Sequence, residues 1–268
     1  MEISSTQNPN IKRLLALQQK SAERRKSGLF VVEGARELGH CLSAGYEVEQ
    51  LFVCHELSPA LPPDVRPLQG EPISIPLHLY ERVAYRGSTE GVIAVVRARP
   101  HSLAQLQLRT NPLIVVLEGV EKPGNLGAIL RSADAAGADA VLVCDPLTDL
   151  YNPNLIRASI GAIFTVPCVA CTSAECIDFL HAHGIQILTA QLQDSQPYYH
   201  TDMRCGTAIV MGTEATGLTP QWRQAAQAHI LIPMLGRLDS LNVSVSTAIL
   251  LYEAVRQRNI EDRRLCYC

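Results

Sequence analysis

The last third of the chain contains Ile209-Val210-Met211-Gly212-Thr213-Glu214-Ala215-Thr216-Gly217-Leu218, an apolar run that stops at a glycine. Thr207–Met211 has the length and composition of a short buried strand. Gly212 and Gly217 free the following loop to adopt positive φ, or let a ligand approach the main chain. The stretch therefore predicts a strand end that is built to hold a ligand.

A second strand and a long helix are expected soon after this loop. His229–Ile232 is a short apolar run that Pro233 stops. Ser240 or Asn242 can cap a helix that runs to about Arg258, because a short side-chain oxygen accepts from the free N–H groups of the first turn. Two loops and a helix start are thus expected to converge.

Strands and helices alternate from Pro112 onward, which is typical of an α/β domain with a parallel sheet covered on both faces. The expected strands are 113–117, 140–143, 164–169 and 185–190, and the expected helices are 126–136, 154–159 and 174–183. Sites in such sheets lie beyond the carboxyl ends of the strands. The residues expected there are Glu118, Asp145, Thr189, Ala190, Gly212 and Pro233.

The first hundred residues predict a smaller α/β domain. Asn8 and Pro9 start a helix that runs to about Lys26 and stops at Gly28. A strand at 29–33, a helix at 35–44 and strands at 50–54 and 91–97 follow, with a proline-rich stretch at 57–76. We place the boundary near residue 105, which gives an N-terminal domain of residues 1–105, a linker to about 112 and a second domain of residues 106–268.

Arg24, Arg25 and Lys26 form a local cluster of positive charge in a chain whose net charge is −3. One interpretation is a solvated helix face, because most charge runs are no more than that. The other is a surface that contacts the phosphates of a nucleic acid. The near-balanced total charge excludes a basic protein that coats nucleic acid, but it leaves room for a local patch.

Composition limits the class of protein further. With 268 residues, 47% of them apolar, the chain can bury two moderate cores. No apolar run approaches the roughly 20 residues that cross a bilayer, and the first residues lack the order of a signal peptide. We therefore expect a cytoplasmic protein without a membrane partner. The nine cysteines have no regular spacing, so we expect reduced thiols.

Cys168, Cys171 and Cys176, with His181 and His183, are the residues that could suggest zinc. They include one CxxC pair and no second pair at the spacing of a zinc finger. The histidines are better explained as the end of a surface helix, where positive charge suits the helix dipole. The sequence therefore predicts no metal site.

A glycine-containing stretch from Glu118 to Ala133 precedes a predicted helix, so phosphate binding has to be considered. The stretch has neither the G-x-G-x-x-G spacing of a dinucleotide site nor the G-K-[ST] ending of a P-loop. Asn125 can simply cap the helix. Arg131, about two turns further on, can present its guanidinium to a phosphate or a carboxylate.

Three stretches of the second domain together resemble the ordered motifs of the SpoU (TrmH-like) RNA 2′-O-ribose methyltransferases of the SPOUT superfamily. They are Asn125–Ala133, Met211–Leu218, and Ile232–Met234 with Ser240–Val245. The resemblance covers residues 112–258. The first hundred residues are more loosely similar to the RNA substrate-binding domain of many of these enzymes.

This resemblance implies a fold, a cofactor and a partner. The second domain is expected to bind S-adenosylmethionine in a deep trefoil knot and to form a homodimer through the knot region. The implied reaction is methyl transfer to a ribose 2′-hydroxyl of RNA, and the first domain favours ribosomal RNA. Periodicity alone does not suggest a knot, because knots are nearly absent from proteins.

The resemblance also implies site residues. The cofactor is expected to meet main chain at Gly212, Ile232 and Leu241, with Thr189 and Ala190 as further candidates. The polar motif residues implied as catalytic are Asn125, Arg131, Glu214, Ser240 and Asn242. Arg131 is expected to orient a phosphate and stabilise the developing alkoxide, because a guanidinium stays protonated and is a poor base. Asn125 is expected to position the ribose, and Glu214 to orient Arg131.

Three alternatives stay open. The first is tRNA as the substrate, the second a noncatalytic RNA-binding protein with this fold, and the third a nucleotide-dependent oxidoreductase. The intact motif residues argue against a pure binder, and the missing glycine fingerprint argues against the oxidoreductase.

Overall fold

The computed structural model describes residues 2–57, 65, 67–68, 70–85, 90–99, 101–120, 122–213 and 216–258. The chain divides into two compact units, one of residues 1–100 with 149–165 and one of residues 101–148 with 166–268. Residues 149–165, predicted to belong to the second domain, are thus grouped with the first unit. No helix in the described ranges is long and apolar enough to span a membrane.

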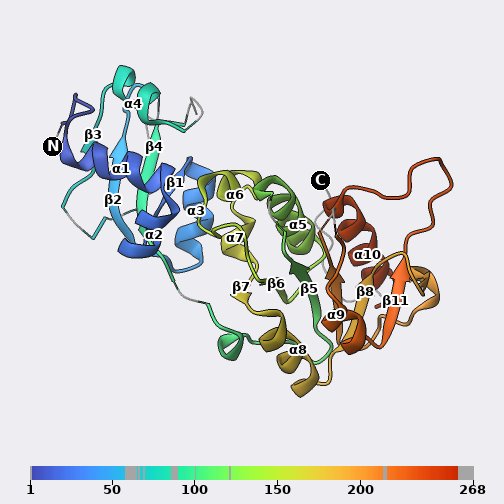
Figure 1. Ribbon diagram of the computed structural model, residues 1–268. Coiled ribbons are helices and arrows are strands. Elements are labelled where there is room, and N and C mark those ends of the chain that lie inside the picture. Colours follow the sequence, from blue (N-terminus) through green and yellow to red (C-terminus); the bar gives the residue numbers. More distant parts are fainter. Residues whose placement is uncertain are drawn as a thin grey trace. The chain divides into compact units, whose positions relative to one another are not determined.

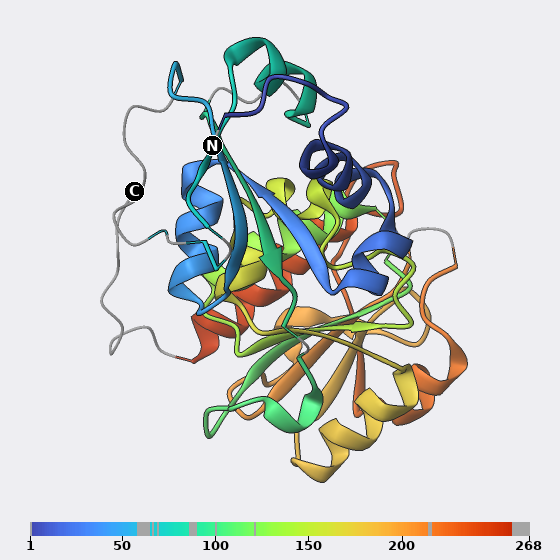
Figure 2. The same cartoon turned by 90° about the vertical axis from the view of Figure 1, so that its left-hand side faces the viewer.

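The first unit is a four-stranded sheet with helices packed on it (Figures 1 and 2). The strand order is β1-β4-β2-β3, with β4 antiparallel to β1 and β2, and β3 parallel to β2. The strands are β1 (Leu29–Glu33), β2 (Val48–Val53), β3 (Ile73–Ser74) and β4 (Val92–Arg97). The helices are α1 (Pro9–Gln19), α2 (Ser21–Ser27), α3 (Ala35–Ser43), α4 (Leu77–Val83), α6 (Pro153–Ala158) and α7 (Ala162–Thr165).

Helices α1 and α2 replace the single helix predicted from Pro9 to about Lys26. Lys20 lies between them with extended backbone, φ −117° and ψ 111°. Gly28 ends α2 with φ 65°, a left-handed conformation that glycine adopts without a Cβ clash. The break gives the basic residues of α2 a helix of their own, whose orientation differs from that of α1.

An aromatic cluster fixes residues 149–165 on β1. Phe30 stacks on Tyr151 with ring centroids 4.3 Å apart, and on Phe164 at 5.9 Å. Tyr46 meets both of these partners edge-on. Side chains alternate along a strand, so Phe30 faces away from the core that Val31 shares with α1. Phe164 therefore contributes to this cluster from α7, and the strand predicted at 164–169 begins four residues later, as β7 (Cys168–Cys171).

The second unit is a seven-stranded sheet in the order β7-β6-β5-β10-β8-β11-β9, and every neighbouring pair is parallel. Helices α8 and α9 pack on one face, and α5 and α10 on the other (Figure 1). The strands are β5 (Leu113–Glu118), β6 (Ala140–Cys144), β7 (Cys168–Cys171), β8 (Gln186–Ala190), β9 (Gln196–Pro197), β10 (Thr207–Met211) and β11 (Ala228–Leu231). The α-helices are α5 (Pro123–Ala135), α8 (Ser173–Ala182), α9 (Pro220–Ala225) and α10 (Val243–Gln257), with short 3₁₀ helices η1 (Leu103–Gln105) and η2 (Tyr198–His200). The predicted parallel α/β sheet is confirmed.

Of the two predicted N-caps near the site, the structure confirms the one of α10 and contradicts the one of α5. Asn242 caps α10 as predicted, because its side chain accepts from the backbone N–H of Ser244 at 3.0 Å. Helix α5 begins at Pro123 with Lys122 as its N-cap, three residues before the predicted start. Proline suits the first helical position, where no N–H is needed. Asn125 is therefore inside the first turn, and the idea that it caps the helix is wrong.

Candidate functional site

A pocket of about 400 Å³ lies beyond the carboxyl ends of β8, β10 and β11. Ala190, Met211 and Leu231 end these three strands, and the loops that follow them form the walls. Helix α10 contributes further apolar lining. This is the edge at which parallel α/β sheets bind ligands. Five residues that the family resemblance implies line the pocket: Ala190, Gly212, Ile232, Ser240 and Leu241.

Gly212 is required where β10 ends, because another main-chain segment passes close to it. A Cβ at this position would lie 2.6 Å from the carbonyl oxygen of Gly217 and 2.7 Å from the nitrogen of Leu218. Thr213 and Gly217 pair across the tight loop, and Gly217 takes φ 68°. Gly212 therefore allows the close approach of another main-chain segment, where the sequence suggested a ligand, and Gly217 supplies the predicted positive φ.

The lining of the pocket is mostly apolar. Its charged side chains, among the described residues, are Arg223 and Asp239. The Arg223 guanidinium already donates to Gln193 Oε1 at 2.8 Å and pairs with Asp194 at 3.0 Å. Apolar walls and exposed main-chain polar groups can hold a flat heteroaromatic ring in a fixed orientation without a charged partner.

A buried carboxylate anchors the far end of the pocket loop. Glu118, the last residue of β5, accepts hydrogen bonds from the Thr219 N–H at 2.8 Å and its hydroxyl at 2.7 Å. Ser173 Oγ lies 3.2 Å from Glu118, donates to Asp145 at 2.6 Å and accepts from the Trp222 indole N–H at 3.2 Å. This network fixes the start of α9 against β5 and α8. The strand-end position of Glu118 and Asp145 was predictable, but nothing in the sequence indicated Thr219 or Ser173 as partners.

Thr189 is absent from the pocket lining that the described residues form. It is fully buried, and its hydroxyl is hydrogen-bonded to His229 Nδ1 at 2.6 Å on the neighbouring strand β11. The Thr189 side chain therefore links two strands, and contact of this residue with the cofactor stays a prediction.

Asn125 and Asn242 meet between the first turns of α5 and α10. Asn242 Nδ2 donates to Asn125 Oδ1 at 3.1 Å, and Asn242 Oδ1 accepts from Ser244. The Asn242 side chain thus caps α10 through its amide oxygen and is hydrogen-bonded to α5 through its amide nitrogen. The packing of α5 against α10 brings together two motif residues that are 117 positions apart.

Arg131 and Glu214 complete the set of predicted catalytic residues. Arg131 is exposed on α5. Six residues after Asn125, it is about 9 Å further along the helix axis and about 240° around it, so the two side chains leave different sides of α5. Glu214 lies outside the described residues.

Arg24 is not available to a phosphate. It is 6% exposed, its guanidinium pairs with Asp149 at 2.6 Å, and it donates to the carbonyl oxygens of Leu17 and Gln18. The prediction that Arg24 contacts RNA is wrong, because its donors are used inside the first unit. Arg25 and Lys26 are exposed on α2.

A parallel α/β unit with a pocket at this edge of the sheet defines a domain that binds a small ligand. The chain belongs to the SpoU rRNA methylase family, whose family model matches residues 112–252. The model of the MRM3-like substrate binding domain matches residues 8–94. The resemblance predicted from the three motifs is thereby confirmed.

Several known proteins are similar over almost the whole chain. The 23S rRNA (guanosine(2553)-2′-O)-methyltransferase RlmP of Bacillus subtilis is 28% identical, over 94% of this chain and 98% of its own. The 23S rRNA (uridine(2479)-2′-O)-methyltransferase of Streptomyces viridochromogenes is 30% identical, over 95% and 92%. The crystal structure of the SpoU methyltransferase AviRb from Streptomyces viridochromogenes in complex with AdoMet is similar with a TM-score of 0.85, at 28% identity over 94% and 98%.

Proposed function

We propose that this protein transfers a methyl group from S-adenosylmethionine to a ribose 2′-hydroxyl of ribosomal RNA. The observation that carries the proposal is the pocket beyond β8, β10 and β11, lined by the motif residues Gly212, Ile232 and Leu241. The names of both relatives support ribosomal RNA over tRNA. Those names specify a guanosine in one case and a uridine in the other, so no base is included in the proposed specificity. An rRNA substrate is also what supports a cytoplasmic location.

The pocket fits S-adenosylmethionine. Its volume of about 400 Å³ lies within the range of small-molecule sites, about 300–1,000 Å³. Main chain at Gly212, Ile232 and Leu241 can read the edge of an adenine, and the apolar walls suit its faces. When bound, this cofactor supplies a methyl group activated on a sulfonium. The AdoMet complex of AviRb supports the assignment.

The polar motif residues would position the ribose and assist loss of the 2′-hydroxyl proton. Asn125, whose amide oxygen Asn242 fixes, positions the ribose. Arg131 orients a phosphate and stabilises the developing alkoxide as a permanently charged donor. Glu214 orients Arg131, and Ser240 lies at the pocket itself. Alignment of the two reactants supplies much of the rate in such a transfer.

The first unit would hold the RNA. The match of residues 8–94 to a substrate binding domain supports this role. Exposed Arg25 and Lys26 on α2 offer two cations to the phosphate backbone.

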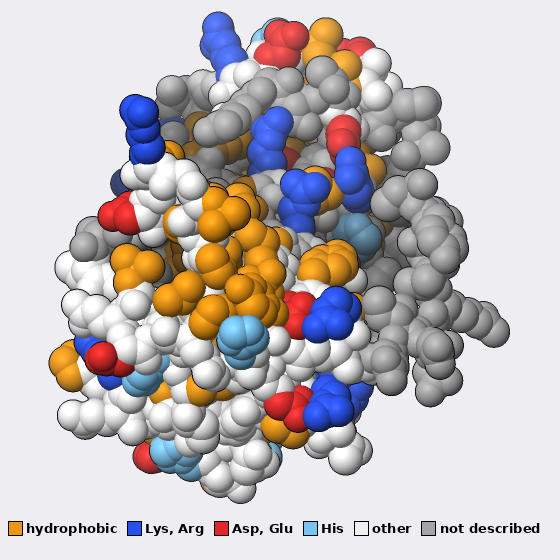
Figure 3. Space-filling model, turned by 90° about the vertical axis from the view of Figure 1, so that its right-hand side faces the viewer, with side chains coloured by type: hydrophobic (Ala, Val, Ile, Leu, Met, Phe, Trp, Pro, Cys, Tyr) orange, Lys and Arg blue, Asp and Glu red, His pale blue; other side chains and the backbone are white. Residues whose placement is uncertain are grey.

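A deep trefoil knot and a homodimer complete the proposal, and the family resemblance supports both. The loop after β11 and the start of α10 expose Leu235, Leu238, Leu241 and Val245. Figure 3 shows hydrophobic side chains gathered on the face that carries the β11 side of the sheet. Gathered apolar side chains of this kind mark protein–protein contacts. A second copy of the chain is the proposed partner.

Methyl transfer to defined RNAs tests the function. The protein is incubated with methyl-labelled S-adenosylmethionine and either ribosomal RNA or tRNA from cells that lack it. We expect label in ribosomal RNA, at a ribose that is already 2′-O-methylated in cells that contain the protein. Label found only in tRNA would mean that the substrate is tRNA and not ribosomal RNA. RNA binding without label would favour the noncatalytic alternative, and thermal stabilisation by NAD but not by S-adenosylmethionine would favour the oxidoreductase.

A further inference from the structure

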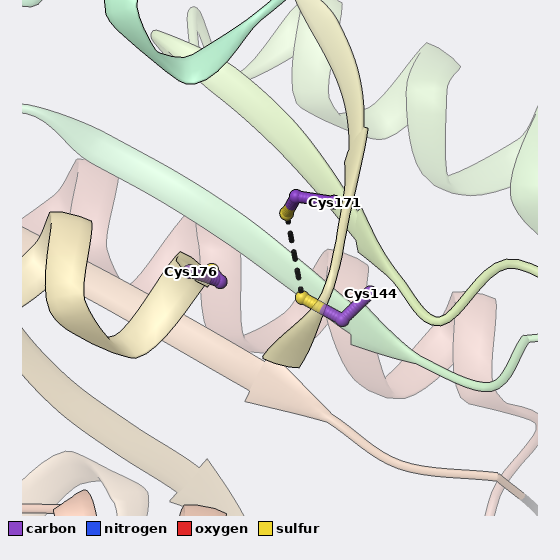
Figure 4. A group of neighbouring side chains, drawn as sticks. All are labelled: Cys144, Cys171 and Cys176. Atoms are coloured by element: carbon purple, nitrogen blue, oxygen red, sulfur yellow. Dashed lines mark hydrogen bonds between the residues drawn. The ribbon is translucent and has the colours of Figure 1, made fainter. Parts of the chain in front are cut away.

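Three cysteines converge in the second unit, away from the pocket lining. Cys144 ends β6, Cys171 ends β7 and Cys176 lies in the first turns of α8. Their three sulfur atoms all lie within 4.8 Å of one another, and the Cys144 and Cys171 sulfurs are 3.9 Å apart. Figure 4 shows Cys144 and Cys171 pointing toward each other, with Cys176 on the adjacent helix. Cys144 and Cys176 are fully buried, and Cys171 is partly exposed.

The fold, not the local sequence, creates this cluster. Cys144 and Cys171 are directly paired across the parallel strands β6 and β7. Cys144 precedes Cys171 by 27 residues, so no metal-binding spacing includes it. Of the ligands that the sequence offered, Cys171 and Cys176 belong to the cluster. Cys168 lies outside it, and His183 Nδ1 is 2.8 Å from the Phe179 carbonyl oxygen.

The geometry suits a thiophilic metal ion. Zinc–sulfur bonds of about 2.3 Å in a tetrahedral site place two sulfurs about 3.8 Å apart, close to the observed separation. Cys144 and Cys176 also belong to the hydrophobic core of the second unit, so the mutual approach of the three sulfur atoms, and not burial, is the observation that points to a metal. A disulfide would join two of these cysteines and would not account for the proximity of the third sulfur atom. Soft thiolate ligands select zinc over magnesium or calcium.

Among the three thiols the pKa is lowered at Cys171 alone, and it is raised at Cys144 and Cys176. Hydrogen bonds from Cys144 and Cys176 lower the pKa of Cys171, although burial and the carboxylates of Glu175 and Asp145 oppose this. Cys171 directly precedes Thr172, the N-cap of α8, where the helix dipole stabilises a thiolate. Hydrogen bonding to Cys171 and burial raise the pKa of Cys144, so a metal must displace that proton to solvent.

We propose that Cys144, Cys171 and Cys176 bind one zinc ion as three thiolates, with water as the fourth ligand on the partly exposed side of Cys171. The ion would cross-link the elements that carry the three cysteines. It ties β6 and β7 to the start of α8, beside Asp145 and Ser173, which belong to the network that anchors Thr219 and the pocket loop. It is independent of the proposed methyl transfer.

Zinc stoichiometry in the full chain tests the site. The background carries Cys205→Ser, Cys266→Ser and Cys268→Ser, which removes three of the six cysteines outside the cluster and leaves Cys41, Cys54 and Cys168. Reduced protein is loaded with zinc chloride, dialysed and titrated with a mercurial reagent that releases thiolate-bound zinc. We expect about one zinc per chain in this background and in Cys168→Ala, which removes a buried cysteine of the same strand outside the cluster. We expect almost none in Cys144→Ala, Cys171→Ala or Cys176→Ala.

Cobalt provides a readout that does not depend on the stability of a variant. Added to the reduced background protein, Co²⁺ should give sulfur-to-metal charge-transfer absorption that Zn²⁺ displaces, together with a higher melting temperature in zinc. Equal zinc content in Cys176→Ala and Cys168→Ala would overturn the proposal. So would the absence of both zinc retention and cobalt–thiolate absorption in the fully reduced protein.

Discussion

Gly212 is required by its surroundings, whereas Gly236 is not. A Cβ at Gly212 would collide with main chain, whereas one at Gly236 meets nothing within 4 Å. Main chain cannot rotate away as a side chain does, so we expect Gly212→Ala to cost about 1–3 kcal/mol of stability. Because the loop must shift, S-adenosylmethionine affinity should fall at least about tenfold.

Calorimetric titration and denaturant unfolding measure both effects. Gly236→Ala is the control and should match the unmodified chain. If Gly212→Ala bound the cofactor with normal affinity, the loop would not be part of the cofactor site.

Variants of Arg131 distinguish a role in catalysis from a role in cofactor binding. It is exposed on α5 and does not line the pocket in the described part of the chain. We expect Arg131→Ala to reduce methyl transfer about a hundredfold or more, the effect of losing one preorganised donor, with little change in cofactor affinity. Arg131→Lys should remain strongly impaired, because it keeps the charge but loses the planar fork. Single-turnover methylation of RNA measures the rates.

Two outcomes would contradict this role. A normal rate with Arg131→Lys would mean that a point charge suffices. Loss of cofactor binding in Arg131→Ala would make Arg131 a structural residue of the pocket.

At the scale of elements, α2 carries two kinds of arginine. Arg25 and Lys26 are exposed, while Arg24 is buried against Asp149. We expect Arg25→Ala with Lys26→Ala to flatten the salt dependence of RNA binding by about one to two units of slope, with stability unchanged. Arg24→Ala should instead lower the free energy of unfolding by about 3 kcal/mol, because it leaves the largely buried Asp149 carboxylate without its ion-pair partner.

Filter binding at several salt concentrations and urea unfolding distinguish the two variants. An unchanged salt slope in the double variant would mean that α2 is a solvated face. A flattened slope in Arg24→Ala with normal stability would reverse the assignment of the two arginines.

Asp139 ties the starts of two strands to the segment that precedes β5. It precedes β6, and its carboxylate accepts from the Leu113 N–H at the start of β5 and from Arg109 Nε at 2.6 Å. Burial opposes its ionisation, but these hydrogen bonds hold the pKa of Asp139 below its usual value. The stabilisation is therefore complete above the unfolded pKa of about 3.9, and it is lost as pH falls through the folded pKa.

Asp139→Asn should accordingly lower stability at neutral pH by about 1–3 kcal/mol and weaken its acid dependence. Urea unfolding between pH 7 and pH 3 measures this. Asp202→Asn is the control, since the pKa of Asp202 is also lowered, to about 2 by Arg204, but the pair is exposed and should contribute little. Equal losses in the two variants would mean that burial at Asp139 adds nothing.

Local patterns predicted most elements, and partners distant in sequence explain the errors. The strand at Thr207–Met211 and the cap of α10 by Asn242 depend on neighbouring residues alone, and both were predicted. Arg24 is buried because of Asp149, 125 residues away, and Thr189 is turned to His229, 40 residues away. The hydrophobic periodicity of the sequence does not predict such contacts between residues far apart in the chain. The glycine, proline and asparagine signals around the pocket are local, which is why Gly212 could be placed from sequence.

At the scale of the whole molecule, α10 presents an apolar stripe to solvent. Val245 and Tyr252 are seven residues apart, so they lie on one face of the helix, and they are 47% and 51% exposed. A stable homodimer buries about 800 Å² on each partner, and charges at its centre are not tolerated. We therefore expect the unmodified chain to be a dimer, and Val245→Glu with Tyr252→Glu to be a monomer with methyl transfer reduced at least tenfold.

Sedimentation equilibrium measures the assembly, and Leu147→Glu provides a matched control. Leu147 is 68% exposed in the segment after β6 and is not part of α10, so a negative charge there should leave a dimer intact. If the double variant were still a dimer, the partner would use another face. If the unmodified chain were already a monomer with full activity, each pocket would be complete within one chain, and the exposed stripe on α10 would need a different partner.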